Sequence, residues 1–292
     1  MVVLENEELL VEINELGAEL KRIYGKKNDI EYLWKGDQGP RFWQRSATIL
    51  FPFVGRLQDA HYTYCGKEYK IGCHGFAKDS VFDVIDKNDK SVTFELVSNE
   101  KTLAEYPFDF KLRITYTLVG MHVAERVVVE NTDKKDLLFK VGFHPGFNLP
   151  LTKECAFEDY SIVFENATKP LKRGISVRGL DLSTDFDCPE IVGKTMRLNH
   201  EIFKDDAIVL SKTEGKAILK SDKSEHGVEL TYDASWCGIW QTYDNETPFV
   251  AIEPWYQLPG KDLEYTALEK IEDINKLKTG ETAEYKLDFQ LF

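Results

Sequence analysis

The sequence lacks the motifs that mark several large classes of enzyme. It contains no Gly-x-Ser-x-Gly, no P-loop and no Gly-x-Gly-x-x-Gly. Hydrolysis from a nucleophile elbow and nucleotide binding are therefore without support. No apolar run approaches the ~18 residues that a membrane-spanning helix needs. The first residues, MVVLENE, do not form a basic segment followed by an apolar one, so no secretion signal is expected.

Cysteines are few, and basic residues are outnumbered by acidic ones. The five cysteines are odd in number and include no Cys-x-x-Cys pair, which, with the missing signal, predicts a reduced, soluble, cytoplasmic protein. Lys and Arg number 37 against 50 Asp and Glu, so the net charge is −13. A nucleic acid or an anionic membrane would need a basic face, so neither is expected as a partner. A neutral sugar is compatible with this charge.

The pattern that is present throughout the chain is that of β-strands. Apolar and polar residues alternate over 110–118, a turn at Gly120 follows, and a second run covers 123–129. Further strand-like segments cover 2–4, 8–13, 19–24, 31–34, 137–143, 161–164, 207–211, 216–220, 228–232, 238–243, 249–253 and 284–292. Residues 263–277 fit one short helix, and 171–198 fit a long connection over one edge. We predict an all-β fold, a large antiparallel β-sandwich formed by residues 1–292 as a single domain.

A histidine follows the strand-like segment 137–143. Pro145 favours an extended backbone at His144, because the proline ring disfavours the helical region for the residue before it. The imidazole is therefore expected on a rigid strand end, where fixed geometry suits acid–base chemistry near neutral pH. A core histidine that is hydrogen-bonded at a strand end fits the same residues.

Three other residues also stand at the ends of apolar or glycine-rich segments. Glu253 closes the apolar strand 249–253, so it is expected either to be paired or to have a pKa raised by desolvation, as a general base has. Arg56 ends the run ILFPFVGR and can present its planar fork to paired oxygens; a surface salt bridge is the alternative. His74 lies between glycine and cysteine neighbours that permit close approach of a ligand; a loop histidine without a function is the alternative. A zinc site is not expected, because His74 and His144 lack close-set partner ligands.

Taken together, these stretches resemble the aldose 1-epimerase (galactose mutarotase-like) superfamily, and most closely its LacX-related bacterial branch. The resemblance covers nearly the whole chain. It rests, in the family's order, on FPFVGR at 51–56, HGF at 74–76, YPF at 106–108, GFHPGFN at 142–148, DA at 206–207 and IEPW at 252–255. The family fold is a large antiparallel β-sandwich, as the strand pattern also predicts.

The resemblance implies roles for five residues. Glu253 matches the base that takes the proton of the sugar C1 hydroxyl, and His144 matches the acid that protonates the ring oxygen. Arg56, His74 and Asp206 match positions that hold substrate oxygens, with Asp205 as the adjacent alternative to Asp206. No metal or nucleotide cofactor is implied. The role of His144 requires a proton to deliver, so its pKa is expected to lie within reach of neutral pH.

Aromatic residues near the site affect which sugar would fit. Trp255, Trp240 and Phe147 are candidates to line the pocket and stack on a sugar, or to lie in the core. Tyr256 stands where the branch usually has a small residue, which predicts a reshaped pocket.

The implied function is an aldose 1-epimerase that acts on an aldohexose. The alternatives are a hexose-6-phosphate 1-epimerase and a non-catalytic carbohydrate-binding protein. A hexose-6-phosphate 1-epimerase needs cations near the pocket, and the candidates are Arg41, Arg45, Lys172, Arg173 and Arg178. A homodimer is compatible with the sequence but not required by it.

Overall fold

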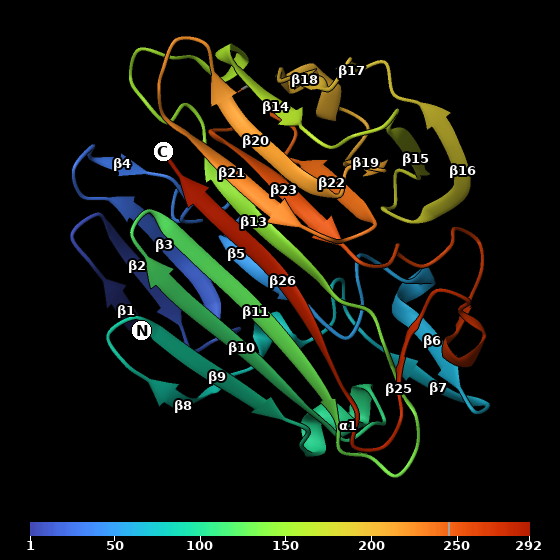
Figure 1. Cartoon of the computed structure of the whole chain (residues 1–292). Coiled ribbons are helices and arrows are strands. Elements are labelled where there is room, and N and C mark those ends of the chain that lie inside the picture. The colour runs from blue at the N-terminus through green and yellow to red at the C-terminus, as the bar shows by residue number, and fades with distance from the viewer. Residues whose placement is uncertain (245) are drawn as a thin grey trace.

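Two large sheets form the body of the protein (Figure 1). The computed structural model describes residues 1–244 and 246–292. In spatial order, the 10-stranded sheet contains β17 (Ile191–Val192), β18 (Thr195–Arg197), β14 (Tyr160–Phe164), β20 (Gly215–Ser221), β21 (Gly227–Tyr232), β26 (Thr282–Leu291), β11 (His122–Asn131), β10 (Phe110–Val119), β9 (Ser91–Val97) and β8 (Asp83–Lys87). The 7-stranded sheet contains β16 (Asp181–Asp187), β15 (Leu171–Ile175), β19 (Ile208–Ser211), β22 (Trp236–Trp240), β23 (Phe249–Trp255), β13 (Gly142–Asn148) and β5 (Ala47–Leu50).

Smaller sheets and short helices complete the described part of the chain. The small sheets are β1 (Val2–Glu5), β2 (Leu9–Asn14), β3 (Glu19–Gly25) and β4 (Ile30–Glu31); β12 (Leu137–Phe139) with β25 (Asn275–Leu277); and β24 (Thr266–Ala267), β6 (His61–Tyr64) and β7 (Lys67–Lys70). The helices are α1 (Glu100–Glu105) and the 3-10 helices η1 (Gln58–Ala60), η2 (Ala77–Asp79), η3 (Phe157–Asp159), η4 (His200–Phe203) and η5 (Leu268–Lys270). Within the described residues, none of these helices is long and apolar enough to cross a membrane.

The two large sheets pack face to face, with the 10-stranded sheet in front in Figure 1. Apolar side chains of both sheets, such as Leu112, Phe147 and Phe289, form one contiguous buried cluster between them. The strand pairs within both sheets are antiparallel, as the hairpin of β10 and β11 with its partners Ile114 and Val127 illustrates. The predicted antiparallel β-sandwich is therefore confirmed.

Two sequence-based expectations about local structure are wrong. The stretch 171–198 is not an irregular connection, because it contains β15, β16, β17 and β18. Most of β16 is exposed on both faces, so its sequence carries no alternation. The stretch 263–277 contains no α-helix: it forms β24, the three-residue η5 and β25.

The strand that carries His144 also differs from expectation. The chain leaves β12 after Phe139, and the backbone N–H of Lys140 donates to the Pro52 carbonyl (2.8 Å). A new strand, β13, then begins at Gly142, so His144 lies inside a strand rather than at its end. Pro145 is accommodated because β13 pairs with β5 there and with β23 at Gly142 and again from Gly146 onward. His144 is therefore anchored from both neighbouring strands.

Candidate active site

The outer face of the 7-stranded sheet carries a row of neighbouring residues across four strands. Gly238 of β22 lies opposite Glu253 of β23, and His144 of β13 lies opposite Thr48 of β5. The register of β13 against β23 places His144 between the pairs Gly142–Trp255 and Gly146–Ala251, beside Glu253. Because alternate residues of a strand point to opposite faces, Phe143 and Ile252 enter the core while His144 and Glu253 point outward.

Two loops bring Arg56 and His74 to this face. His74 has a left-handed backbone (φ 63°), and its N–H donates to the Gly55 carbonyl (2.8 Å). The following Gly75 must be glycine, because a Cβ there would lie 2.3 Å from the Phe51 carbonyl oxygen. Arg56 is fixed through its carbonyl, which accepts the N–H of Gly260 (2.8 Å). The two side chains therefore reach the site from well-fixed backbone.

Asp206, and not Asp205, faces the site. Asp206 follows η4 with φ 102°, and its Oδ1 accepts the N–H of Ala207 (2.8 Å). A Cβ built on Gly179 would lie 3.4 Å from Arg56 Nε and 3.6 Å from Asp206 Oδ2, so the glycine leaves room where these two side chains converge. Asp205 is exposed and does not line the cavity.

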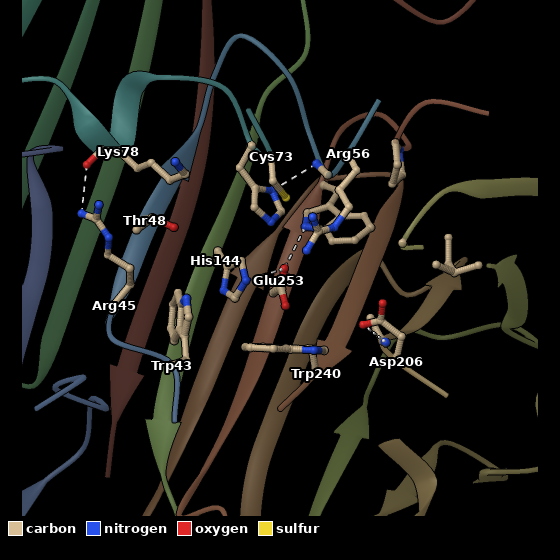
Figure 2. Close-up of a pocket in the computed structure, with 17 residues that line it drawn as sticks. Trp43, Arg45, Thr48, Arg56, Cys73, Lys78, His144, Asp206, Trp240 and Glu253 are labelled. Carbon is tan, nitrogen blue, oxygen red and sulfur yellow. Dashed lines mark hydrogen bonds and ion pairs between the residues drawn. The ribbon is translucent and has the colours of Figure 1, made fainter. Parts of the chain in front are cut away.

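These side chains surround a cavity of about 310 Å³ (Figure 2). This volume lies in the range of small-molecule sites. The lining residues are Trp43, Arg45, Thr48, Gly55, Arg56, Cys73, His74, Lys78, His144, Ile175, Gly179, Asp206, Ala207, Trp240, Glu253, Trp255 and Pro259. All five residues assigned by resemblance are among them. Within the described part of the chain, no group of three or more His, Cys, Asp or Glu is arranged to hold a metal ion.

His144 and Glu253 form a buried acid–base pair. His144 Nε2 lies 3.2 Å from Glu253 Oε2, and the two residues are 6% and 2% exposed. Glu253 Oε2 also accepts the indole N–H of Trp255 (3.2 Å). Its other oxygen, Oε1, has no hydrogen-bond partner among the described residues and is the one free to receive a proton from a ligand. Glu253 is therefore paired, which is one of the two arrangements expected from the sequence.

Desolvation dominates the electrostatics of this pair. It raises the pKa of Glu253 well above its usual value, and Asp206 adds to the rise against the opposing effect of the Trp255 hydrogen bond. It also lowers the pKa of His144 well below its usual value, and His74 lowers it further. The expectation of a near-neutral pKa for His144 is therefore wrong for the ligand-free site, because burial disfavours the imidazolium.

The low pKa of His144 does not remove the proton from the site. A protonated Glu253 beside a neutral His144 holds the same number of protons as a carboxylate beside an imidazolium. The two forms differ only in where one proton lies along the 3.2 Å contact. Such a pair titrates as a unit. A ligand that offers new hydrogen bonds to both groups can therefore select the charged form, which contains one base and one acid.

His74 is held in one tautomer. The N–H of Gly55 donates to His74 Nδ1 (3.0 Å), so Nδ1 carries the lone pair and Nε2 carries the hydrogen. Burial lowers the pKa of His74 to about 3, and the nearby Lys78 and Arg56 contribute. His74 is therefore a neutral hydrogen-bond donor at physiological pH, which suits it to bind a hydroxyl oxygen rather than to exchange protons.

The predictions for the aromatic residues have mixed outcomes. Trp240 and Trp255 line the cavity, as expected. Phe147 does not: it lies on the opposite face of β13, is fully buried, and its ring centroid lies 6.3 Å from that of Phe289. Tyr256 does not reshape the cavity either, because it also points away from it, with its hydroxyl bonded to Asp233 and its ring against Tyr285.

Among the cavity residues that sequence reasoning missed are Trp43, Thr48 and Lys78. Thr48 had a weak signal, as a polar residue within the apolar run 47–54. Trp43 and Lys78 lie in irregular segments whose sequence gives no indication of where they point. Of the five candidate cations, only Arg45 lines the cavity. The others are not among the lining residues, and they pair with acidic partners: Arg41 with Asp244, Lys172 with Glu190, Arg173 with Asp181 and Arg178 with Asp262.

Comparison with known proteins identifies the family and the fold of this chain. A family model described as aldose 1-epimerase matches residues 1–266. The chain is 31% identical over 299 residues to a protein LacX, encoded on a plasmid of Lactococcus lactis subsp. lactis, with 99% of each chain covered. It is 32% identical to a galactose mutarotase related enzyme from Lactobacillus acidophilus, with a TM-score of 0.93 and coverage of 100% of this chain and 97% of that one. It is 33% identical to a galactose mutarotase-like protein from Lactobacillus casei, with a TM-score of 0.93 and full coverage of both chains. With matches of this extent, the chain belongs to the aldose 1-epimerase family.

Proposed function

We propose that this protein interconverts the α and β anomers of an aldohexose by acid–base opening of the sugar ring. Family membership supports an isomerase of this type. The 3.2 Å contact of buried His144 and Glu253 at the cavity carries the proposal. The C1 hydroxyl oxygen and the ring oxygen are bonded to the same carbon, so an adjacent base and acid can serve both at once. Each such group typically contributes about 10²–10⁴-fold to the rate.

Ring opening transfers two protons. Glu253, as the carboxylate, takes the proton of the C1 hydroxyl, and His144, as the imidazolium, gives a proton to the ring oxygen. The bond between C1 and the ring oxygen breaks, and its electron pair goes to that oxygen while C1 becomes an aldehyde. Rotation about the C1–C2 bond presents the other face of the aldehyde. Ring closure then returns both protons, so the pair ends in its starting state.

The remaining polar residues of the cavity would hold the sugar. Neutral His74 offers an N–H, and Arg56 has no ion-pair partner among the described residues, so its guanidinium is available to hydroxyl oxygens. Asp206 adds an acceptor for hydroxyl protons near Arg56. Donors and an acceptor therefore line the cavity around the acid–base pair.

Anomer exchange with the unmodified protein tests the proposal. Fresh α-D-galactose and α-D-glucose are followed by polarimetry or by the NMR signals of their C1 protons, with and without protein. We expect faster equilibration with protein, at a rate that saturates with sugar concentration. A carbohydrate-binding protein without catalysis is the competing reading. Measurable binding with an unchanged exchange rate on all free and phosphorylated sugars tried would support it instead.

A phosphorylated aldohexose is the second candidate substrate, because two cations lie at one end of the cavity. Thr48 is the cross-strand neighbour of His144, and Lys78 and Arg45 line the cavity on the same side (Figure 2). If His144 donates to the ring oxygen, C1 and C5 lie on either side of that oxygen. Glu253 acts at the C1 side, so the substituent on C5 points away from Glu253. A phosphate on C6 would then approach Lys78 and Arg45, whose charges suit it.

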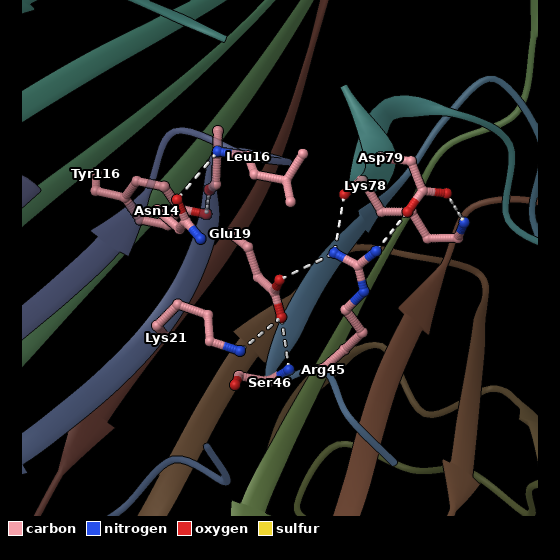
Figure 3. Close-up of polar contacts among 10 residues, drawn as sticks. Asn14, Leu16, Glu19, Lys21, Arg45, Ser46, Lys78, Asp79 and Tyr116 are labelled. Atoms are coloured by element: carbon pink, nitrogen blue, oxygen red, sulfur yellow. Dashed lines mark hydrogen bonds and ion pairs between the residues drawn. The ribbon is translucent and has the colours of Figure 1, made fainter. Parts of the chain in front are cut away.

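The cations at this end belong to a partly neutralised network (Figure 3). Arg45 pairs with buried Glu19 (3.4 Å) and with Asp79, and Lys78 also pairs with Asp79. Lys21 contacts Glu19 (3.5 Å) from the far side. Three cations thus face two carboxylates, which leaves one positive charge for a ligand.

Comparison of glucose with glucose 6-phosphate separates the two candidates. A phosphorylated substrate predicts that Lys78→Gln lowers kcat/KM for the phosphate ester by about tenfold or more, as loss of a charged hydrogen bond does, and leaves the free sugar unaffected. Lys21→Gln is the matched control, since Lys21 belongs to the same network but does not line the cavity. Equal effects of Lys78→Gln on both sugars would favour the free aldohexose.

A further inference from the structure

Trp43 lies face to face with the ring of His144. The ring centroids are 4.4 Å apart and the planes are inclined by 24°, which is a stacked arrangement (Figure 2). Two other rings meet His144 at right angles: His74 at 5.4 Å (84°) and Trp240 at 5.7 Å (81°). Three rings thus contact the imidazole, and of the three Trp43 is the one that stacks on it.

His144 lacks the contact that usually orients a histidine. The second ring nitrogen of a working imidazole commonly donates to a carbonyl or carboxylate, which fixes the tautomer and the ring direction. His144 Nδ1 is buried and has no hydrogen-bond partner among the described residues. A buried polar atom without a partner needs an explanation. Here the direction of the ring depends on packing and on the polar contact of Nε2 with Glu253.

A glycine in the same strand makes room for the indole. Gly146 lies two residues after His144, so both are on the same face of β13. A Cβ on Gly146 would lie 3.1 Å from Cζ3 of Trp43, which is tighter than ordinary contact. The absence of a side chain at 146 lets the indole lie against the sheet and against His144. The segment His144-Pro145-Gly146 therefore contains both the proposed acid and the space for its support.

We propose that Trp43 is a positioning residue for the acid step: its stacked indole takes the place of the missing Nδ1 hydrogen bond and keeps His144 Nε2 directed at Glu253 and the ring oxygen. Rotation of the imidazole about its Cβ–Cγ bond would break the stack, so the stack resists rotation. An electron-rich face also stabilises the imidazolium when it forms. The inference rests on the proposed function, because it presumes that His144 delivers a proton.

Three substitutions distinguish a positioning role of Trp43 from a sugar-stacking role. Trp43→Leu removes the ring, and Trp43→Phe retains a ring that can stack. Gly146→Ala changes neither Trp43 nor His144, but its methyl group pushes the indole away from the imidazole. We expect Trp43→Leu to lower kcat by about tenfold or more with little change in KM, because small misplacements of a reacting group are costly. Trp43→Phe should restore most of kcat, and Gly146→Ala should give an intermediate loss. Phe42→Leu is the control, since Phe42 packs edge-on against Trp34 and does not line the cavity.

An NMR measurement reads the position of the ring without reference to activity. The ring current of a stacked indole shifts the carbon-bound protons of His144 upfield, and this shift should be lost in Trp43→Leu and reduced in Gly146→Ala. If wild-type protein shows the shift but no anomer exchange, the proposed function fails. If wild-type protein is active and Trp43→Leu leaves kcat unchanged, or raises KM alone as loss of a sugar-stacking surface would, the positioning role is wrong.

Discussion

Two buried glutamates of this protein share their burial and differ in their surroundings. Glu253 and Glu125 are 2% and 3% exposed, and desolvation raises the pKa of both carboxyls, that of Glu125 to about 8. Glu125 of β11 lies opposite Tyr116 of β10, whose hydroxyl contacts Glu125 Oε1 (3.0 Å) and the Ala18 carbonyl (2.9 Å). Glu253 instead lies at a cavity, against an imidazole.

The difference shows that a raised carboxyl pKa reports burial and not catalysis. A phenol such as Tyr116, whose pKa desolvation raises well above its usual value, does not exchange protons near neutral pH. Its single hydrogen also cannot serve both neighbouring oxygens, so a protonated Glu125 completes the contact. An imidazole such as that of His144 is able to exchange protons, and the cavity beside it has the volume of a small-molecule site. The partner and the access, rather than the pKa, therefore distinguish Glu253 as a candidate base.

The largest expected effect is on His144, the partner that separates the two glutamates. His144→Asn removes the acid and should lower the anomerisation rate by about 10²–10⁴-fold. His200 is the matched control, because it too is stacked on an aromatic ring, Phe157 (4.1 Å, 22°), but does not line the cavity. His200→Asn should keep the rate. Near-wild-type turnover by His144→Asn, measured by the NMR exchange of the C1 protons, would contradict the role of the pair.

The next effect is on stability and concerns Glu125. Its pKa rises from 4.5 to about 8 on folding. Below pH 4.5 both states are protonated. Between the two values the unfolded chain releases the proton that the folded chain keeps, so stability falls as pH rises and then levels off above about 8. Glu125→Gln removes this slope. Over that range the free energy of unfolding of Glu125→Gln should increase relative to that of wild type by up to about 5 kcal/mol, since one pKa unit corresponds to about 1.4 kcal/mol.

Urea denaturation at a series of pH values from 5 to 9 measures this difference. The free energies of unfolding of wild type and Glu125→Gln should diverge from pH 5 to about pH 8 and keep a constant difference above that. Parallel curves would show that Glu125 is already ionised in the folded protein.

The smallest effect concerns the two neighbouring aspartates. Asp206→Asn should raise KM by about tenfold, because one charged hydrogen bond to the sugar is lost, while kcat falls less. Asparagine tolerates a positive φ as aspartate does, so the substitution adds no new strain to the backbone at φ 102°. Asp205→Asn is the control and should change neither constant in steady-state kinetics. The reverse pattern would reassign the substrate contact to Asp205.

The fold could be predicted where strands are half-buried. The alternation over 110–118 predicts β10 because one face packs on the core and the other meets solvent. The same criterion fails for β16, which is exposed on both faces. It also misplaces the end of the strand that carries His144, because Pro145 and Gly146 are read as breakers, whereas β13 accommodates both. That the chain folds as one domain stays a prediction, and a homodimer stays compatible with the sequence without being required by it.

The site could be predicted where residues stand in motifs at strand or loop positions. His144, Glu253, Arg56, His74 and Asp206 all line one cavity. Trp43 and Lys78 could not be predicted, since their positions depend on how irregular segments fold back on the sheet. The pKa of His144 could not be predicted either, because it depends on desolvation and on His74, which no local pattern records.

The most direct test compares Glu253→Gln with Glu125→Gln. Both substitutions replace a buried carboxyl by its neutral isostere, and only the first touches the cavity. The measurement is the rate at which fresh α-D-galactose or α-D-glucose reaches anomeric equilibrium with each protein. The account predicts that Glu253→Gln abolishes the acceleration and that Glu125→Gln retains it. Full acceleration by Glu253→Gln, or an equal loss in both variants, would contradict it.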